Sequence, residues 1–469
     1  GAYNPQFQGQ APAPGPNGQF QGQAPAPGEK KSRGKMTAII SVIVVAILVV
    51  VGGGAFALSR WFFGGYKSPD ALAQSIDSAF AKNSLVSLAG AASPEELNAA
   101  TAWQKDYKHN GGADWSQLMD LKALKDYIDQ IDIKKSEMEY TVDTKSDQVA
   151  LITITKWEGD IEIKPELADK IREHYKEAKG SDLTANESQA FDKMKQDIQN
   201  KPVSSGNILE NFPNNKLTLV SVKEDGKWYL SGYMTVAEQF LGTDSAQPNY
   251  SANFTDVKGA SSPEEAVSGM VDALRNGASI GSEDVYRYLD LPERRVAAVY
   301  GGGSSSSEYS ASDMDGSGVQ VTWGLSSTKV SGGAIVNLGT TSITTDEYKV
   351  EFNGDSLTVS YPDTDTRTFR TTTKTMTTNY TEGLVNPERL GVFTVEDASG
   401  WHVSFVRTIG NLNLLAASDD AVNQAIDGLW SATGSHDVDV SKDEIRDLAL
   451  NNKPVGALMV IGWNFAKNA

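Results

Sequence analysis

Two segments far apart in the chain share one pattern of polar and apolar positions. Residues 67–80 read KSPDALAQSIDSAF, and residues 261–274 read SSPEEAVSGMVDAL. Ser, then Pro, then an acidic residue is typical of a helix start, because Ser caps free N–H groups and Pro fits the first helical position. Apolar residues then recur at helical spacing: Leu72, Ile76, Ala79 and Phe80 in the first segment, and Val267, Met270, Val271 and Leu274 in the second. The pattern predicts two helices, each with one buried face.

A matching pair of hairpins is predicted downstream of these helices. Residues 220–235 read VSVKEDGKWYLSGYMT, and residues 392–408 read VFTVEDASGWHVSFVRT. Asp225-Gly226 predicts a tight turn between alternating strands, and residues 397–400 predict a slightly longer turn at the same place. After the turn both segments read Trp-x-x-Ser-x-x-x-Thr, with Trp228, Ser231 and Thr235 in one and Trp401, Ser404 and Thr408 in the other. We interpret this as duplication of one domain.

The chain between each helix and its hairpin differs in the two halves. The first half predicts further helices, a strand at 148–156, and a charged helical hairpin at 164–201 that forms a solvated insertion. The second half is rich in strands, including a hairpin at Asn353-Gly354. Both halves read helix first and antiparallel sheet afterwards, so the predicted class is α+β. The predicted units are domains at 67–245 and 260–412 and a C-terminal helical extension at 413–469.

An uncharged stretch of 23 residues, 36–58, precedes these domains. At ~1.5 Å per residue it exceeds the ~30 Å hydrocarbon core of a bilayer, so it predicts a transmembrane helix. The flanking residues are Lys30, Lys31, Arg33 and Lys35 before the span, and Arg60 and Trp61 after it. By the positive-inside rule they predict a single-pass protein with a cytoplasmic N-terminus. A cleaved signal and a buried core helix are the alternatives.

Residues 1–35 form a Gln-, Pro-, Gly- and Ala-rich tail in which PQFQGQAPAPG is followed by GQFQGQAPAPG. Such a composition cannot bury enough apolar surface to fold, so a disordered cytoplasmic tail is predicted. The 469-residue chain has no cysteine, which together with the predicted anchor indicates the outer face of a bacterial plasma membrane. The net charge of −18 argues against nucleic acid as a partner.

Several of these features resemble a known family. An opening helix after Ser-Pro-acid, further helices and a late strand pair reading acid-Asp-Gly-Lys-Trp are similar to the nuclear transport factor 2-like superfamily. A basic flank, one span and such a domain outside resemble mammalian-cell-entry-associated and related actinobacterial envelope proteins. The resemblance covers residues 67–245 and 260–412, and it implies a cone-shaped α+β fold. That superfamily includes enzymes, transport adaptors and regulatory modules, so the resemblance does not give the function.

Candidate catalytic and metal-binding patterns are sparse. The four histidines, His109, His174, His402 and His436, are scattered, and no two have metal-ligand spacing. Residues 310–318, SASDMDGSG, contain Asp313, Asp315 and Gly316, a fragment of a calcium loop without its later Glu. GASIG at 277–281 fits Gly-x-Ser-x-Gly, but it follows a predicted helix, whereas a nucleophile elbow follows a strand. The sequence therefore predicts no catalytic residue, no metal site and no cofactor.

Trp228 and Trp401 are expected in the core, and the alternative is that one of them stacks on a ligand in a cone pocket. The function expected from the sequence is a membrane-anchored accessory or scaffold protein of the cell envelope, whose tandem domains bind a protein partner or small ligand outside. One alternative is a membrane-tethered enzyme that uses an acid in a cone-shaped pocket. Another is a sensor that signals to the cytoplasmic tail.

Overall fold

The two predicted opening helices are both present. The computed structural model describes residues 65–467 except 89, 107–113, 115–116, 119–120, 201–202, 242–246, 303–317 and 434–440. Within it, α3 spans Pro69–Ala81 and α9 spans Pro263–Arg275, each with 13 residues. The Ser68 hydroxyl accepts from the Ala71 N–H at 3.1 Å, and the Ser262 hydroxyl accepts from the Glu265 N–H at 3.1 Å. Both helices therefore begin at the predicted Ser caps.

The first domain packs α3 against an antiparallel sheet. The strands lie in the order β1-β2-β4-β5, and β3 pairs with the second half of β2. Their bounds are Ile131–Thr144 (β1), Val149–Ile163 (β2), Val203–Asn207 (β3), Leu217–Glu224 (β4) and Lys227–Ser231 (β5). The rings of Phe80 on α3 and Trp157 on β2 meet edge to face with centroids 4.9 Å apart in the core between helix and sheet.

The second domain repeats this plan with shorter strands. Its sheet has the order β14-β13-β8-β7. The bounds are Ser326–Val330 (β7), Gly333–Asn337 (β8), Val392–Asp397 (β13) and Gly400–Val403 (β14). Because the order and the antiparallel pairing match those of the first domain, β7, β8, β13 and β14 correspond to β1, β2, β4 and β5.

Each domain carries its insertion at the same place, between its second and third sheet strands. In the first domain the insertion includes the helical hairpin of α6 (Glu166–Lys179) and α7 (Ala185–Asn200), within the predicted 164–201 segment. In the second domain it supplies four strands of a separate five-stranded sheet of order β12-β11-β10-β9-β6. The insertion supplies β9 (Ser342–Thr344), β10 (Lys349–Asn353), β11 (Ser356–Thr364) and β12 (Thr371–Asn379), and the fifth strand, β6 (Gln320–Thr322), precedes β7. The different insertions explain why the halves look different in sequence.

The two tryptophans occupy equivalent positions. Trp228 on β5 forms an antiparallel bridge with Tyr66, and Trp401 on β14 forms one with Ala260. Two residues later, Leu230 and Val403 form parallel bridges with Ala92 and Leu289. The repeated hairpin motif therefore marks the same structural place in both domains, while the exact domain boundaries stay a prediction.

The hairpin turns have equal length, which corrects the expectation of a longer second turn. Glu224 pairs with Lys227 and Asp397 pairs with Gly400, so two residues connect the strands in each case. In the second turn the Asp397 carboxylate accepts from the Ser399 N–H at 2.7 Å, which closes the turn without an Asp-Gly pair.

A helix follows each hairpin, although the sequence pattern predicted these residues to be part of the hairpins. These helices are α8 (Gly232–Leu241) and α13 (Phe405–Asn411). The Ser and Thr of the repeated motif build the corner between strand and helix. Ser231 accepts from the Met234 N–H at 3.1 Å and so caps α8. Thr235 accepts from the Val220 N–H of β4 at 2.9 Å, and Thr408 accepts from the Phe393 N–H of β13 at 2.9 Å.

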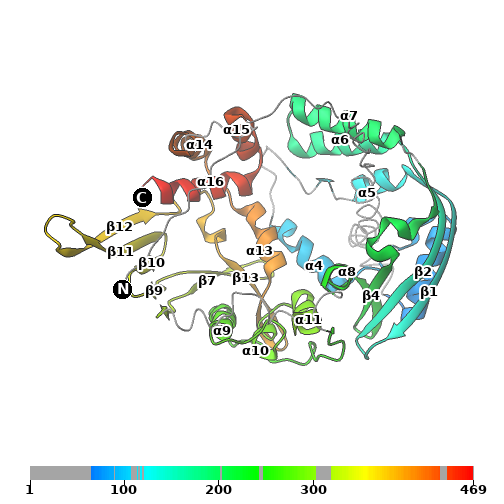
Figure 1. Ribbon diagram of the computed structural model, residues 1–469, viewed down its shortest axis with the longest axis horizontal. Helices are drawn as coiled ribbons and strands as arrows, with labels where there is room; N and C mark the ends of the chain where they lie inside the picture. The colour runs from blue at the N-terminus through cyan, green and yellow to red at the C-terminus, as the bar shows by residue number, and fades with distance from the viewer. Residues whose placement is uncertain are drawn as a thin grey trace, which may run out of the picture.

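The domains meet through equivalent helices near the centre of Figure 1. These are α4 (Pro94–Thr101) of the first domain and α11 (Leu291–Tyr300) of the second. α4 contacts α11 and α13, while α11 contacts α4 and α8. Because α8 and α13 are equivalent, the contacts are reciprocal, as in the self-complementary interface of a twofold homodimer. The short helices α5 (Leu121–Ile128) and α10 (Glu283–Tyr286) complete the two domains.

The C-terminal extension is helical, as predicted, and touches both insertions. It consists of α14 (Asp419–Thr433), α15 (Lys442–Asn451) and α16 (Lys453–Ala466). The Thr378 hydroxyl of β12 donates to the Asn464 carbonyl of α16 at 2.7 Å. On the other side, Lys179 of α6 forms an ion pair with Asp447 of α15 at 3.2 Å, where the helices lie side by side at the top of Figure 1.

The predicted transmembrane fold is corrected by this structure. Among the described residues, no helix is both long and apolar enough to cross a membrane. The longest of them, α7, has 16 residues and spans ~24 Å, short of the ~30 Å that a bilayer core requires. This finding contradicts the predicted single-pass topology and the plasma-membrane location. The prediction rests on residues 36–58, and these, the tail 1–35 and the flanking Arg60 and Trp61 lie outside the described residues.

Candidate functional site

A buried carboxylate links the second helix of the first domain to its last helix. Glu96 is the third residue of α4 after the Ser93 cap, a position from which Glu often reaches back to its own cap. Here it reaches across to the start of α8 instead. It accepts from the Gly232 N–H at 2.7 Å, the Tyr233 N–H at 3.2 Å and the Ser231 hydroxyl. A negative charge stabilises a helix N-terminus, so Glu96 caps the start of α8 together with Ser231.

Glu293 has the equivalent position in the second domain. It accepts from the Val406 N–H at 2.9 Å and from the Ser404 hydroxyl at 3.3 Å, at the start of α13. Its other oxygen, Oε2, is buried and has no hydrogen-bond partner within the described residues. Burial and the nearby charge of Asp290 raise the pKa of Glu293 to about 7. The same architectural role is therefore filled by a well-bonded carboxylate in one domain and a poorly bonded one in the other.

Arg295 of α11 crosses the interface from the second domain to the first. Its side chain is 1% exposed. It donates from Nη1 to Glu224 at 2.7 Å and from Nη2 to the Ser93 hydroxyl at 2.9 Å, and it lies 3.7 Å from Glu96. A buried guanidinium is tolerated only when it is paired and hydrogen-bonded. Arg295 therefore ties α11 to both α4 and β4 of the other domain.

The interface gathers more acids than bases. Burial, followed by the charges of Glu224 and Asp290, raises the pKa of Glu95. Burial also raises the pKa of Glu96, although the Arg295 charge opposes this. Arg407 compensates part of the excess, because its Nε donates to Asp290 at 3.3 Å. We call Glu95, Glu96, Glu224, Asp290, Glu293, Arg295 and Arg407 the interface cluster.

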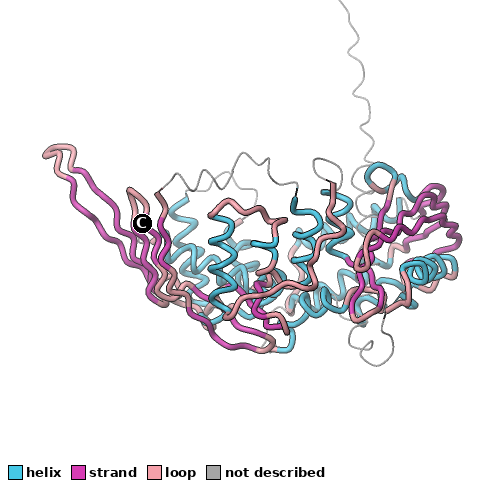
Figure 2. Tube along the Cα trace, turned by 90° about the horizontal axis from the view of Figure 1, so that it is seen from below, coloured by secondary structure: helices cyan, strands magenta, loops and turns pink. Residues whose placement is uncertain are grey.

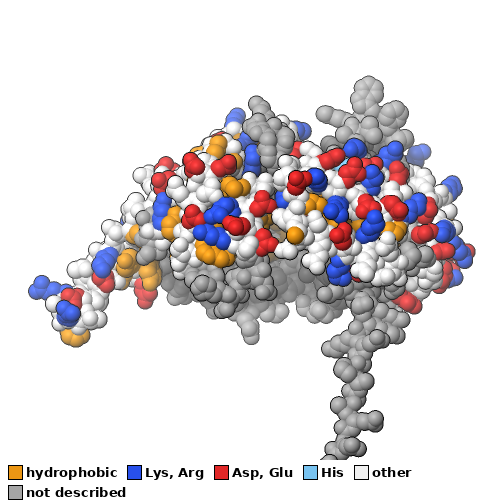
Figure 3. All heavy atoms as spheres, turned by 90° about the horizontal axis from the view of Figure 1, so that it is seen from above, with side chains coloured by type: hydrophobic (Ala, Val, Ile, Leu, Met, Phe, Trp, Pro, Cys, Tyr) orange, Lys and Arg blue, Asp and Glu red, His pale blue; other side chains and the backbone are white. Residues whose placement is uncertain are grey.

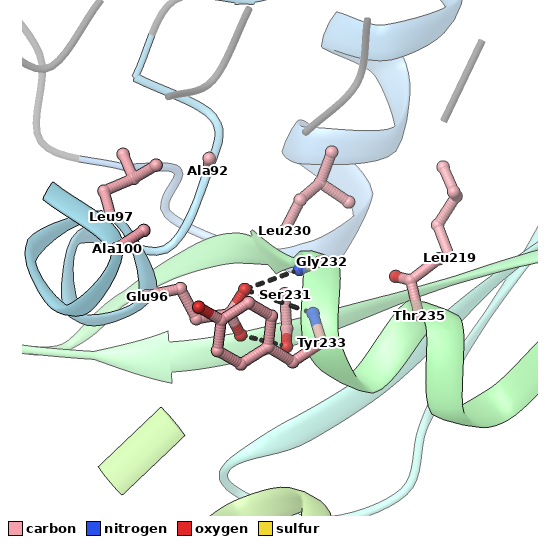
Figure 4. Close-up of a pocket in the computed structure, with 10 residues that line it drawn as sticks. All are labelled: Ala92, Glu96, Leu97, Ala100, Leu219, Leu230, Ser231, Gly232, Tyr233 and Thr235. Atoms are coloured by element: carbon pink, nitrogen blue, oxygen red, sulfur yellow. Dashed lines mark hydrogen bonds between the residues drawn. The ribbon is translucent and has the colours of Figure 1, made fainter. Parts of the chain in front are cut away.

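A small cavity adjoins this cluster between α4 and α8 (Figure 4). Its volume is about 70 Å³, and its walls are mostly apolar, with Leu97 and Ala100 on one side and Leu219 on another. Glu96 is the carboxylate of the lining, and the dashed lines in Figure 4 show both of its oxygens engaged with residues 231–233. Pockets for drug-sized ligands have roughly 300–1,000 Å³. The cavity therefore suits a few water molecules or a very small ligand.

The described histidines have structural partners. His402 is fully buried, and its Nδ1 contacts the Arg287 carbonyl at 2.9 Å. Its Nε2 contacts both Asp397 at 3.1 Å and the Ser399 hydroxyl at 2.9 Å. In a catalytic triad Asp and Ser bind opposite ring nitrogens, so this Ser, His and Asp set does not form one. Burial and the Arg294 charge lower the pKa of His402, which favours the neutral ring.

The remaining sequence candidates form no site among the described residues. His174 pairs with Asp126 at 2.9 Å inside the first domain. His109, His436, Asp313, Asp315 and Gly316 lie outside the described residues, as do Lys30, Lys31, Arg33 and Lys35. GASIG follows the end of α9, where the Ser279 carbonyl accepts from the Ser282 N–H at 3.0 Å in a turn. In the described part of the chain, no group of three or more His, Asp or Glu could hold a metal ion.

The interface cluster was not predicted from the sequence. Its signal was present, because Ser93-Pro94-Glu95-Glu96 and Asp290-Leu291-Pro292-Glu293 each place a cap three residues before Glu. The consecutive Arg294 and Arg295 on a helix with buried alanines were a second signal. Helix spacing alone, however, does not show that Arg295 faces another domain.

Comparison with known proteins identifies no related protein. No family model matches the chain, and no curated protein or solved structure is significantly similar to it.

Proposed function

We propose that this protein is a non-catalytic scaffold whose two fused domains form one rigid unit for binding a protein partner. The observation that carries this proposal is the interface cluster. Arg295 and its partners Glu224, Ser93 and Glu96 hold the two domains together. The buried charges of Arg295, Glu224 and Glu96 are thus committed to the interface.

The geometry offers little support for an acid–base enzyme. A general acid or base must reach a bound substrate within hydrogen-bond distance. Glu96 borders the cavity, but its oxygens already cap α8, and the cavity is small. Glu293 has the pKa of about 7 that such a catalyst needs, yet it is not among the residues that line the cavity. A binding role fits these constraints better.

The proposal is tested by capturing partners on the immobilised full chain from an extract of the source cells, followed by mass spectrometry. We expect one or a few proteins to be retained by the wild type and released from Arg295→Met, whose domains should no longer be held rigidly. Lys82→Met, an exposed substitution on the first domain, is the matched control and should retain the same proteins. Recovery of the same background from wild type and Arg295→Met would contradict a scaffold that depends on the locked domain pair.

A further inference from the structure

The β11–β12 hairpin projects from the molecule as an arm (Figures 1 and 2). β10 pairs with β11 only as far as Lys349 opposite Ser360, whereas β11 and β12 stay paired to Thr364 opposite Thr371. Beyond residue 360 the sheet therefore has two strands and two open faces. Residues 364–375 are all exposed. A two-stranded ribbon of this kind contributes little to a core, so its extension needs another explanation.

The tip of the arm presents an aromatic ring to solvent. Phe369 is 83% exposed and has φ of +53°, a conformation that bulky residues rarely adopt. The turn that holds it is well bonded. The Asp365 carboxylate accepts from the Arg367 N–H at 2.7 Å, and the Asp365 carbonyl accepts from the Phe369 N–H at 2.7 Å. Phe369 therefore lies at a fixed place on the tip.

One edge of the arm has unpaired backbone groups. β12 is the edge strand of its sheet in the described part of the chain. Hydrogen bonds from the Asp365 N–H to the Arg370 carbonyl and from the Tyr380 N–H to the Asp355 carbonyl show that even-numbered residues bond toward β11. Because bonding alternates along an antiparallel pair, Thr371, Thr373, Thr375 and Thr377 direct their N–H and C=O groups outward. Such an edge is a template for another strand.

The charge of the arm indicates what kind of strand it accepts. Arg367 and Arg370 are exposed and have no ion-pair partner among the described residues. Basic, acidic and apolar side chains are visible together at the tip in Figure 3. Lys374, on the same face of β12 as Arg370, is paired with Asp363 at 2.5 Å. Arg367 and Arg370 are therefore unpaired cations on a chain whose net charge is −18. Pairing β12 with β12 of a second copy would bring Arg370 and Lys374 of both copies onto one face. Repulsion between these like charges disfavours such a pairing.

We propose that the arm binds an extended, acidic segment of a partner protein, which adds to the outer edge of β12. The segment's carboxylates pair with Arg367 and Arg370, and Phe369 contacts an apolar side chain beside them. This inference rests on the proposed scaffold function and names the surface and the chemistry of its partner.

The test uses the full chain and a fluorescein-labelled ten-residue peptide of alternating Glu and Val, which places all carboxylates on one face of a strand. Binding is measured by fluorescence anisotropy at low salt. Arg367→Glu/Arg370→Glu is compared with Lys82→Glu/Lys216→Glu, an equal charge change at exposed positions away from the arm. We expect the arm variant to bind about tenfold more weakly than the control variant.

A second pair of variants tests the strand edge. Thr373→Pro removes an outward N–H but keeps the bonds to β11, where Pro362 already lies opposite. Thr373→Val retains the N–H. We expect Thr373→Pro to weaken binding about threefold to tenfold and Thr373→Val to leave it unchanged.

Three results of these measurements would overturn the inference, and a fourth, from the capture experiment, would do so while leaving the scaffold proposal intact. The first is equal binding of a peptide with Gln in place of Glu, and the second is equal binding by the two charge variants. The third is a wild-type dimer that Thr373→Pro converts to a monomer, which would identify a second copy as the occupant. If Thr373→Pro still retains the partner proteins captured by the wild type, the arm inference fails while the scaffold proposal stands.

Discussion

Arg295 in the second domain and Glu224 in the first form a direct ion pair across the domain interface at 2.7 Å, and both side chains are almost fully buried. The pair has no counterpart across the pseudo-twofold relation, because the residue of α4 equivalent to Arg295 is Asn98. The duplicated domains thus keep a common fold but have specialised at the interface. One domain supplies the cation and the other supplies its acidic partners.

Removal of Arg295 should destabilise the protein strongly. Arg295→Met leaves Glu224 and Glu96 buried without their cation, which should cost about 3–5 kcal/mol in free energy of unfolding. Urea denaturation of the full chain measures this, with Lys82→Met as an exposed control. Adding Glu224→Gln to Arg295→Met should recover part of the loss. A loss no larger than that of the control would show that the pair contributes little.

Glu293 should make stability depend on pH. Its pKa is about 7 in the folded protein against 4.5 for an unperturbed Glu, so the folded state binds the proton more tightly. Stability from this group is complete below about pH 4.5 and is lost as the pH rises through about 7, by about 3 kcal/mol in total.

The measurement is the difference in free energy of unfolding between Glu293→Gln and the wild type at pH 5 and pH 8. The Gln side chain cannot ionise, so the free energy of unfolding of the variant should increase relative to that of the wild type as the pH rises. Glu283→Gln, at an exposed position of α10, should show the same difference at both pH values. A difference for Glu293→Gln that does not change with pH would rule out titration of this carboxyl.

The hydroxyls of Thr235 and Thr408 should be essential to the strand-to-helix corners. Thr235→Val leaves the buried Val220 N–H without its acceptor and should cost about 1–3 kcal/mol. Thr408→Val should act in the same way on Phe393. Thr235→Ser keeps the hydroxyl and should cost much less in the same denaturation experiment. Equal effects of Val and Ser would assign the role of Thr235 to packing instead.

Trp228 should behave as a core residue. It is 6% exposed, so Trp228→Ala should lower the free energy of unfolding by about 3–5 kcal/mol. Trp401 is only half-buried, and Trp401→Ala should cost less. Phe369→Ala, which removes an exposed aromatic ring, should change stability by roughly 0.5 kcal/mol or less. A melting temperature of Trp228→Ala equal to that of the wild type would favour a ligand-binding role for the ring.

Local sequence signals predicted much of the secondary structure. The Ser-Pro-acid starts of α3 and α9, the Asp225-Gly226 turn and the charged hairpin of α6 and α7 depend on interactions within a few residues, so they can be read from the chain. The α8 and α13 segments were assigned to the hairpins because the apolar residues after Trp228 and Trp401 continue the strand pattern. The predicted transmembrane fold was wrong, since no helix among the described residues is long and apolar enough to cross a membrane. The prediction rested on residues 36–58, which lie outside the described residues.

The sequence alone determined that two copies of a helix-then-sheet unit follow one another, since caps, turns and the spacing of Trp, Ser and Thr are local. Only the tertiary structure decided what the buried charges do. Glu96 and Glu293 have the same place after a helix cap, yet the pKa of Glu96 depends on burial and on Arg295 from the other domain, while the pKa of Glu293 depends mainly on its burial in the folded protein. Electrostatic interactions depend on distance and desolvation, and folding alone brings these groups together.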